Sequence, residues 1–171
     1  DYPLAKLRKE PWDGVWTIVS YDFPEKIRTK RNRFREKISR LGFGSPQQSL
    51  FVSPLSLERG IEEFVKGEGV ESFVWVARAK RILGMENSEV ARKSWNLDEL
   101  DELYGVLLEA LPRAKKTGGD DLILWQKYFL AVNAADPYLP DELLPKSWVG
   151  VNCEREFKKL DPLRFLRSLF L

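Results

Sequence analysis

The sequence predicts an α+β protein: a ferredoxin-like βαββαβ domain followed by a mainly helical C-terminal domain. Two observations predict this class. Strand-like and helix-like segments alternate through the first half of the chain, and apolar residues then recur at helical spacing through most of the second half. We therefore expect a linker or arm over residues 1–11, the ferredoxin-like domain over 12–86 and the helical domain over 87–171.

A strand over residues 15–22 and a helix over residues 25–41 open the first domain. Pro24 suits the first turn of that helix, because its missing N–H has no intrahelical partner there. Gly42 then supplies the C-cap. We expect one face of the helix to pack on a sheet, because its apolar residues are spaced seven, four and three positions apart: Ile27, Phe34, Ile38 and Leu41.

The alternation continues with a strand over residues 47–53, a helix over 55–67 and a strand over 71–79. Leu57, Ile61, Phe64 and Val65 give the helix its apolar face. A βαββαβ unit needs one more strand, which we expect within residues 80–84 or further along the chain.

The second domain begins with a strong amphipathic helix that starts at Leu97 and carries acids near its N-terminus, where the helix dipole favours them. Residues 115–119 are predicted to be a loop, and Asp120 or Asp121 to cap a further apolar helix. The proline-rich segment 136–150 cannot continue a helix. Its leucines and aromatic residues favour burial, so we expect an ordered connection.

The two ends of the chain carry separate expectations. Residues 151–171 favour a helix interrupted by Pro162, and the very apolar segment 165–171 predicts docking or a subunit contact. The chain begins with Asp1 rather than methionine. We therefore expect a processed or trimmed chain that a further domain precedes.

Composition excludes several kinds of chemistry. The chain has no histidine and a single cysteine, Cys153, which excludes an internal disulfide, a zinc site of cysteine and histidine, and any Ser-His-Asp or Cys-His arrangement. No run approaches the roughly 20 apolar residues that span a bilayer, and no signal-type segment is present. We expect a soluble protein of the cytoplasm, and any enzyme activity would depend on carboxylates, lysines, tyrosines or a carboxylate-bound metal.

The helix predicted over residues 25–41 is strongly basic. Glu25 and Glu36 are its acids, and its basic residues are Lys26, Arg28, Lys30, Arg31, Arg33, Arg35, Lys37 and Arg40. Such a helix can meet phosphates, an acidic partner or the nucleotide of coenzyme A. The alternative is a solvated face whose long side chains lie over the sheet edge.

Asp22 stands where the first strand is expected to end, close to the N-terminus of the following helix. A carboxylate at such an edge can be a metal ligand or an N-cap. The sequence leaves both roles open.

Several short motifs occur along the chain in order. They are Trp12-Asp13-Gly14-Val15-Trp16, Tyr21-Asp22-Phe23-Pro24-Glu25, the arginine-rich helix, Leu41-Gly42-Phe43-Gly44, Gln48-Ser49-Leu50-Phe51-Val52-Ser53-Pro54, Trp95-Asn96-Leu97 and the proline-rich segment 136–150. Together they resemble the PaaX family of transcriptional repressors. The resemblance covers nearly the whole chain.

The resemblance implies a function. Proteins of that family carry an N-terminal winged helix-turn-helix for DNA, a central domain similar to the CRISPR-associated small endonuclease, and a helical C-terminal domain. They repress aromatic-acid catabolism, of which phenylacetate is the type, and an aryl-coenzyme A thioester such as phenylacetyl-coenzyme A releases them from DNA. Here the resemblance implies the central and C-terminal domains, no cofactor besides an acyl-coenzyme A effector, a homodimer, and DNA contacts through a winged helix outside this chain.

An effector of this kind needs cations for its phosphates and apolar walls for its aryl group, most simply at a seam between two domains. The candidate phosphate contacts are Arg31, Arg35 and Lys37, and the candidate walls are Trp125, Tyr128, Phe129 and Trp148. Aromatic residues at helical spacing are more often core, which is the alternative role for these walls.

Two other classes of function stay open. The resemblance to the small endonuclease depends on Tyr21, Asp22 and the segment from Gln48 to Phe51. It implies a metal-dependent nuclease in which Asp22 from each subunit of a dimer holds a divalent cation. The third hypothesis is an assembly scaffold without a ligand.

Overall fold

The computed structural model describes residue 8 and residues 11–82 and 84–160. It divides into two compact units: Asp1–Trp95 with Pro137–Leu144 form unit 1, and Asn96–Asp136 with Pro145–Leu171 form unit 2. The division therefore falls at Trp95 rather than after residue 86, and a short return segment joins unit 1 from the second half of the chain. Most of the predicted arm and the whole of 161–171, with Pro162 and the apolar tail, lie outside the described residues.

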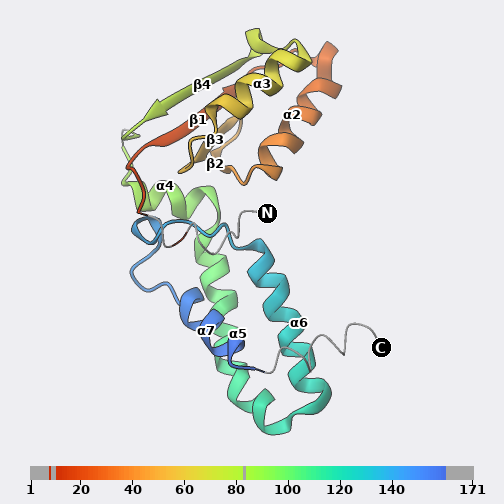
Figure 1. Cartoon of the computed structure of the whole chain (residues 1–171), viewed down its shortest axis with the longest axis vertical. Coiled ribbons are helices and arrows are strands. Elements are labelled where there is room, and N and C mark those ends of the chain that lie inside the picture. The colour runs from red at the N-terminus through yellow and green to blue at the C-terminus, as the bar shows by residue number, and fades with distance from the viewer. Residues whose placement is uncertain (1–7, 9–10, 83, 161–171) are drawn as a thin grey trace. The chain divides into compact units, whose positions relative to one another are not determined.

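Unit 1 is an α+β unit built on a four-stranded antiparallel sheet with strand order β2-β3-β1-β4 (Figure 1). Its elements are β1 (Trp16–Tyr21), η1 (Glu25–Ile27), α2 (Arg28–Arg40), β2 (Gly44–Gln47), β3 (Leu50–Ser53), α3 (Glu58–Glu68), η2 (Glu71–Phe73), β4 (Val74–Ala79), α4 (Asn87–Ser94) and, from the return segment, η3 (Asp141–Leu143). The predicted alternation of strands and helices is present in this order.

Among the residues that the structure describes, no strand follows β4, so the last strand expected within residues 80–84 or later is not found there. The fourth strand is instead β2 (Gly44–Gln47), which pairs with β3 through a turn at Gln48 and Ser49. Pro46 lies in β2, and a proline fits there because β2 is an edge strand, where a missing N–H does not interrupt the ladder. Its polar sequence gives no apolar alternation, so periodicity alone does not reveal it.

One face of the sheet and the two longer helices of unit 1 share a core. Val19 of β1, Phe34 and Ile38 of α2, and Ile61 and Val65 of α3 are all buried in one cluster. The predicted apolar face of the helix over residues 25–41 is therefore confirmed, although its first turn is the separate 3₁₀ turn η1.

Gly42 ends α2 as predicted, through its backbone freedom. Gly42 has φ 77° and its N–H donates to Ser39 (3.0 Å), while Phe43 N–H reaches back to Ile38 (3.3 Å). This pair of bonds is the Schellman arrangement, in which a left-handed residue satisfies the last carbonyls of a helix.

Helix α4 is absent from the predicted elements. It packs in unit 1 against the return segment, which lies within the proline-rich stretch 136–150 predicted to be an ordered connection. Trp16 is fully buried, and its indole N–H donates to Asn87 of α4 (2.9 Å). Its ring lies 4.9 Å from that of Trp12 and stacks at 6.3 Å on Trp95. Trp12 and Trp16 therefore pack within unit 1.

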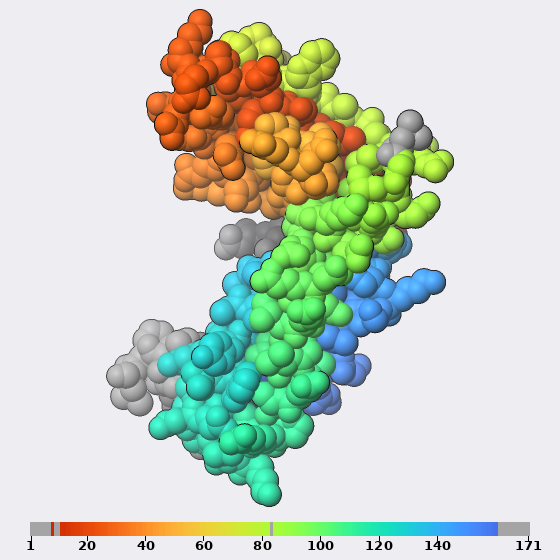
Figure 2. Space-filling view, turned by 180° about the vertical axis from the view of Figure 1, so that it is seen from behind, coloured from red at the N-terminus to blue at the C-terminus, as the bar shows by residue number. Residues whose placement is uncertain are grey.

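Unit 2 consists of α5 (Leu97–Thr117), α6 (Gly119–Ala135) and α7 (Gly150–Lys158), drawn in green, cyan and blue in Figure 2. They share a core that includes Leu100, Tyr104, Phe129 and Phe157. No helix in the described part of the chain combines the length and apolar character that crossing a bilayer requires.

Two local predictions for unit 2 are wrong. Residues 115–117 continue α5, and the break comes at Gly118, whose N–H still bonds to Ala114 (2.8 Å). Asp120 and Asp121 lie inside the first turn of α6 rather than at its N-cap, which is Gly118. Acids in a first turn interact with the helix dipole without a capping bond, so both arrangements produce the same sequence pattern.

Candidate functional site

Asp22 lies directly after β1, where that strand leaves the sheet. Its side chain is exposed, and its backbone N–H donates to the carbonyl of Phe73 (2.9 Å). The N–H of Tyr21 lies 3.4 Å from the carbonyl of Ser49, in the turn between β2 and β3. The structure thus brings together the two segments that carry the resemblance to the small endonuclease, Tyr21-Asp22 and Gln48-Ser49.

The structure narrows the two roles that the sequence leaves open for Asp22. The N-cap of η1 is Pro24 and that of α2 is Ile27, so Asp22 caps neither helix. Within residues 8, 11–82 and 84–160, no three or more His, Cys, Asp or Glu side chains form a group that could hold a metal ion. One carboxylate fills few of the positions around a hard divalent cation, so a metal at Asp22 would need ligands from another molecule.

The three predicted phosphate contacts on the basic helix differ in their surroundings. Arg31 is paired with Glu25 (3.1 Å), and Lys37 Nζ lies 5.8 Å from the centre of the Phe64 ring. Arg35 is exposed and forms no hydrogen bond or ion pair with another described residue. The other cations engaged in contacts on this helix are Arg28 with Glu25, Lys30 with the Glu68 carbonyl, Arg33 with Glu68, and Arg40 with Glu36.

The predicted aromatic walls in unit 2 are of two kinds. Phe129 is buried and stacks on Phe157 with ring centres 4.5 Å apart, so it belongs to the core. Trp125 and Tyr128 lie 5.6 Å apart on α6, and Tyr128 is 52% exposed. Tyr128 therefore presents aromatic surface at the exterior of α6, whereas Trp125 is half-buried and packs against the core of unit 2.

Trp148 packs against its own unit. Its ring meets Tyr104 edge to face at 5.7 Å, and the N–H of the following Val149 donates to Asp101 (2.8 Å). A Cβ on Gly150 would lie 2.6 Å from the Trp148 indole nitrogen. Gly150 is therefore required by the close approach of Trp148, which gives a packing reason for this part of the proline-rich motif.

A small pocket in unit 1 lies between the end of α2, residues 53–55 and Pro137, Tyr138, Leu139 and Pro140 of the return segment. Its volume is about 60 Å³. Ligand pockets for molecules of drug size hold roughly 300–1,000 Å³. This pocket is therefore too small to enclose an aryl-coenzyme A.

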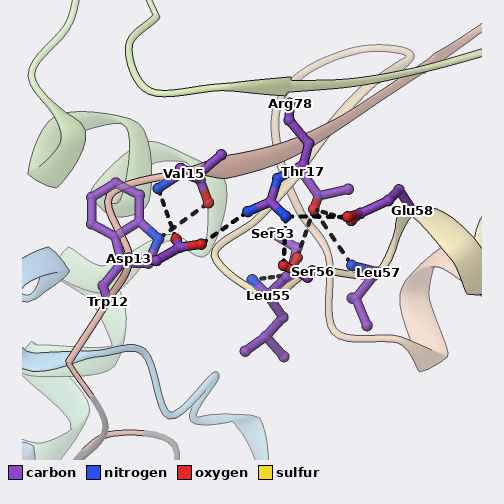
Figure 3. Close-up of polar contacts among 10 residues, drawn as sticks. All are labelled: Trp12, Asp13, Val15, Thr17, Ser53, Leu55, Ser56, Leu57, Glu58 and Arg78. Atoms are coloured by element: carbon purple, nitrogen blue, oxygen red, sulfur yellow. Dashed lines mark hydrogen bonds and ion pairs between the residues drawn. The ribbon is translucent and has the colours of Figure 1, made fainter.

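Arg78 is the centre of a polar cluster that the sequence analysis does not predict. Figure 3 shows its guanidinium between two acids, and it donates to Asp13 (2.9 Å), Glu58 (3.1 Å) and the hydroxyl of Ser56 (2.8 Å). Thr17, which faces Arg78 across β1 and β4, donates to the carbonyl of Leu55 (2.7 Å). The cluster joins the segment before β1, the sheet and the start of α3.

The charges in this cluster suit a structural role. One cation stands between two carboxylates, so the cluster has no spare positive charge for a phosphate. Glu58 begins α3, and a hydrogen bond from its own backbone N–H, followed by the charge of Arg78, holds the pKa of Glu58 below its ordinary value. Asp13 also accepts from Val15 N–H (2.9 Å), which fixes the turn that leads into β1.

Comparison with known proteins gives a family match. Residues 9–91 match the family described as the PaaX protein central Cas2-like domain. The chain is 24% identical over 162 residues to the transcriptional repressor PaaX of Escherichia coli (strain K12), an alignment that covers 86% of this chain and 51% of that protein. The chain thus spans about half the length of the curated relative that it matches.

A solved structure agrees on the fold. The uncharacterized protein Rv0674 from Mycobacterium tuberculosis superposes with a TM-score of 0.66 and 22% identity, covering 91% of this chain and 62% of that one. The family match thus describes residues 9–91 as a Cas2-like domain, and a helical unit follows it in the chain. Residues 9–91 are therefore identified as the central domain of the PaaX family, and the similarity to a PaaX repressor extends over most of the chain.

Proposed function

We propose that this chain is the dimerisation and effector-sensing part of a PaaX-like transcriptional repressor. The observation that carries the proposal is the match of residues 9–91 to the PaaX central domain, which the similarity to the Escherichia coli repressor extends over most of the chain. Its target genes would be those of aromatic-acid catabolism, of the phenylacetate type. A regulatory role without enzyme activity agrees with the description of that relative as a repressor.

The proposal includes partners beyond this chain. The chain covers half of its named relative, so a winged-helix domain elsewhere in the full-length protein would read the operator. Two copies would form a homodimer, because a protein with two-fold symmetry matches an operator with two-fold symmetry. The proposed location of this dimer is the cytoplasm. We also take unit 1 to be a ferredoxin-like module, which its element order and its sheet order β2-β3-β1-β4 support.

The proposed effector is an aryl-coenzyme A thioester. The proposed contacts are Arg31, Arg35 and Lys37 for phosphates and Trp125, Tyr128 and Trp148 for the aryl group. Arg35 and Tyr128 support the proposal best, because their side chains are exposed. Arg31 would have to exchange Glu25 for a phosphate, which is an inexpensive exchange for a solvent-accessible ion pair.

Operator release tests the function. The full-length protein is titrated onto labelled operator DNA, and phenylacetyl-coenzyme A, acetyl-coenzyme A and free coenzyme A are then added separately. We expect the aryl thioester alone to release the DNA at micromolar concentration. Unchanged DNA binding across a panel of aryl thioesters would remove the effector from the proposal, and failure to bind any upstream region of the expected genes would remove the repressor.

A second candidate is a metal-dependent nuclease, which the exposed position of Asp22 after β1 favours. It predicts cleavage of DNA or RNA with Mg²⁺ or Mn²⁺ that disappears in Asp22→Asn and persists in Asp120→Asn, a matched change of an exposed aspartate in α6. Our proposal expects no cleavage by any of the three proteins. Cleavage that Asp22→Asn alone abolishes would establish the nuclease.

A further inference from the structure

One exposed row of α2 differs from the rest of this basic helix. Arg28, Asn32, Arg35 and Ser39 follow each other at spacings of four, three and four, so they lie along a single stripe of the helix surface. All four residues are exposed. We call this row the basic stripe. It is about 16 Å long, because 11 residues of α-helix rise about 1.5 Å each.

Other residues of α2 hold unit 1 together. Phe34 and Ile38 face the core, Lys30 donates to the Glu68 carbonyl (2.5 Å), and Arg33 pairs with Glu68 (2.8 Å). These contacts fix one flank of α2 against the end of α3. The basic stripe takes no part in them, so its residues are not explained by packing.

The basic stripe contains no acid. Its one contact with an acid is that of Arg28 with Glu25 at 4.0 Å, where the arginine side chain is still 68% exposed. Glu25 also pairs more closely with Arg31, and Glu36 on the neighbouring row pairs with Arg40 (2.6 Å). Both nearby acids are therefore engaged more closely by other arginines, so Arg35 has no acidic partner among the described residues and Arg28 has only the long contact with Glu25.

We propose that the basic stripe binds the sugar–phosphate backbone of duplex DNA independently of sequence. Arginine, asparagine and serine are residue types that commonly bind DNA phosphates, and such contacts fix register without reading bases. Phosphates on one strand rise about 3.4 Å apart along the duplex axis, so a stripe of about 16 Å faces several of them. An acidic protein surface could be bound through charge alone and would not need Asn32 and Ser39, the two neutral donors that alternate with the arginines.

This inference rests on the proposed role in gene regulation, which brings the chain to DNA. It gives the chain a backbone contact of its own, additional to the winged helix proposed for the rest of the protein. Base-specific contacts are not expected from the stripe, because its side chains are those that position a protein on the duplex.

Fluorescence anisotropy of this chain with a random-sequence duplex of 20 base pairs tests the proposal, over 50–200 mM salt. Each phosphate contact contributes about 0.9 to the slope of log affinity against log salt. We expect Arg28→Gln with Arg35→Gln to lower that slope by about 1.8 and to weaken binding more than about tenfold. Asn32→Ala with Ser39→Ala should weaken binding while leaving the slope unchanged, because neither residue is charged.

The matched control is Arg113→Gln with Lys116→Gln, which removes the same charge from exposed positions of α5 and should retain the wild-type slope. Circular dichroism of each variant checks folding. The proposal would be overturned if the control lost as much of the salt slope as Arg28→Gln with Arg35→Gln. It would also be overturned if the slope of log affinity against log salt for the wild type were smaller than about 1 in magnitude. Arg35 is also a proposed phosphate contact of the effector, so the two ligands would compete for this side chain. Displacement of the duplex by free coenzyme A at micromolar concentration would assign Arg35 to the nucleotide and overturn the DNA contact. Because the chain is tested without operator or thioester, these results are independent of the test of effector release.

Discussion

Gly44→Ala should destabilise unit 1, because β2 and the end of α4 approach each other too closely for a side chain. A Cβ at residue 44 would lie 2.6 Å from two atoms of the Trp95 ring and 2.7 Å from the Cβ of Ser94. Carbon atoms in good contact are about 3.5–4.0 Å apart, so one side must move by about 1 Å.

The Trp95 ring cannot give way easily. Its indole N–H donates to the carbonyl of Gly42 (3.2 Å), and its ring stacks on the fully buried Trp16. Overpacking of a well-filled site costs about 1–3 kcal/mol. For a chain of 171 residues this corresponds to a fall in Tm of about 2–12 °C.

Gly60→Ala is the matched control, and its effect should have the opposite sign. Gly60 lies in α3, and a Cβ there would have no neighbour within 4 Å. Alanine is more favourable than glycine in a helix by about 0.8–1.0 kcal/mol, so this variant should be more stable than the wild type.

Urea unfolding of both variants, followed by tryptophan fluorescence and by circular dichroism, measures the two shifts. The midpoint of Gly44→Ala should fall and that of Gly60→Ala should rise, with unchanged slopes. A midpoint for Gly44→Ala at or above the wild-type value would refute the reasoning, because it would mean that Trp95 is free to move.

Three further predictions concern buried and charged groups. The folded state holds the pKa of Glu58 below its ordinary 4.5, so this group stabilises the fold above that pH, and the stabilisation is lost as pH falls through the folded pKa. The urea midpoint should therefore fall between pH 7 and pH 3, and it should fall less in Arg78→Gln than in the wild type. An equal fall in both proteins would exclude Arg78 as a cause of the lowered pKa. Tyr104→Phe removes a buried hydrogen bond to Asp136 (2.9 Å) and should lower the free energy of unfolding by about 1–3 kcal/mol. A urea midpoint equal to that of the wild type would contradict this prediction. Burial raises the pKa of the Cys153 thiol to about 12, so a disulfide reagent at pH 8 should modify it slowly in the native chain and rapidly in urea; fast labelling of the native chain would disagree.

The helices over the sheet are predictable from local pattern. Phe34 and Ile38 are found buried as the spacing predicts, because a helix with one apolar face has a single way to dock on a sheet. Glycine signals work equally well, since Gly42 has the left-handed backbone that ends α2.

Elements without a strong local pattern are not predictable in this way. Helix α4 has eight residues and buries only Val90 and Ala91, so it gives little periodicity. Strand β2 contains Pro46 and is defined by its pairing with β3. In both cases the structure depends on contacts with other elements, which a window along the sequence does not contain.

The candidate sites also differ in whether a local sequence pattern predicts them. The strand-end position of Asp22 is predictable, because it follows from one strand and one turn signal. The Arg78 cluster is not, because its ion pair with Asp13 joins residues 65 positions apart and both side chains read as ordinary surface charges. Long-range polar pairs of this kind leave no spacing that a sequence pattern could reveal.

The basic helix illustrates how structure separates charges that look equivalent in sequence. Arg33 and Arg35 are two positions apart, yet they point to different sides of α2, because successive residues in a helix are rotated by about 100°. Arg33 therefore meets Glu68, whose side chain is only 16% exposed, and contributes to the contact with the end of α3. Arg35 meets solvent, so its charge does nothing for the fold that the described residues show. A cation with no structural partner, placed in line with a second one and with two neutral hydrogen-bonding residues, is most simply explained by a ligand outside the chain.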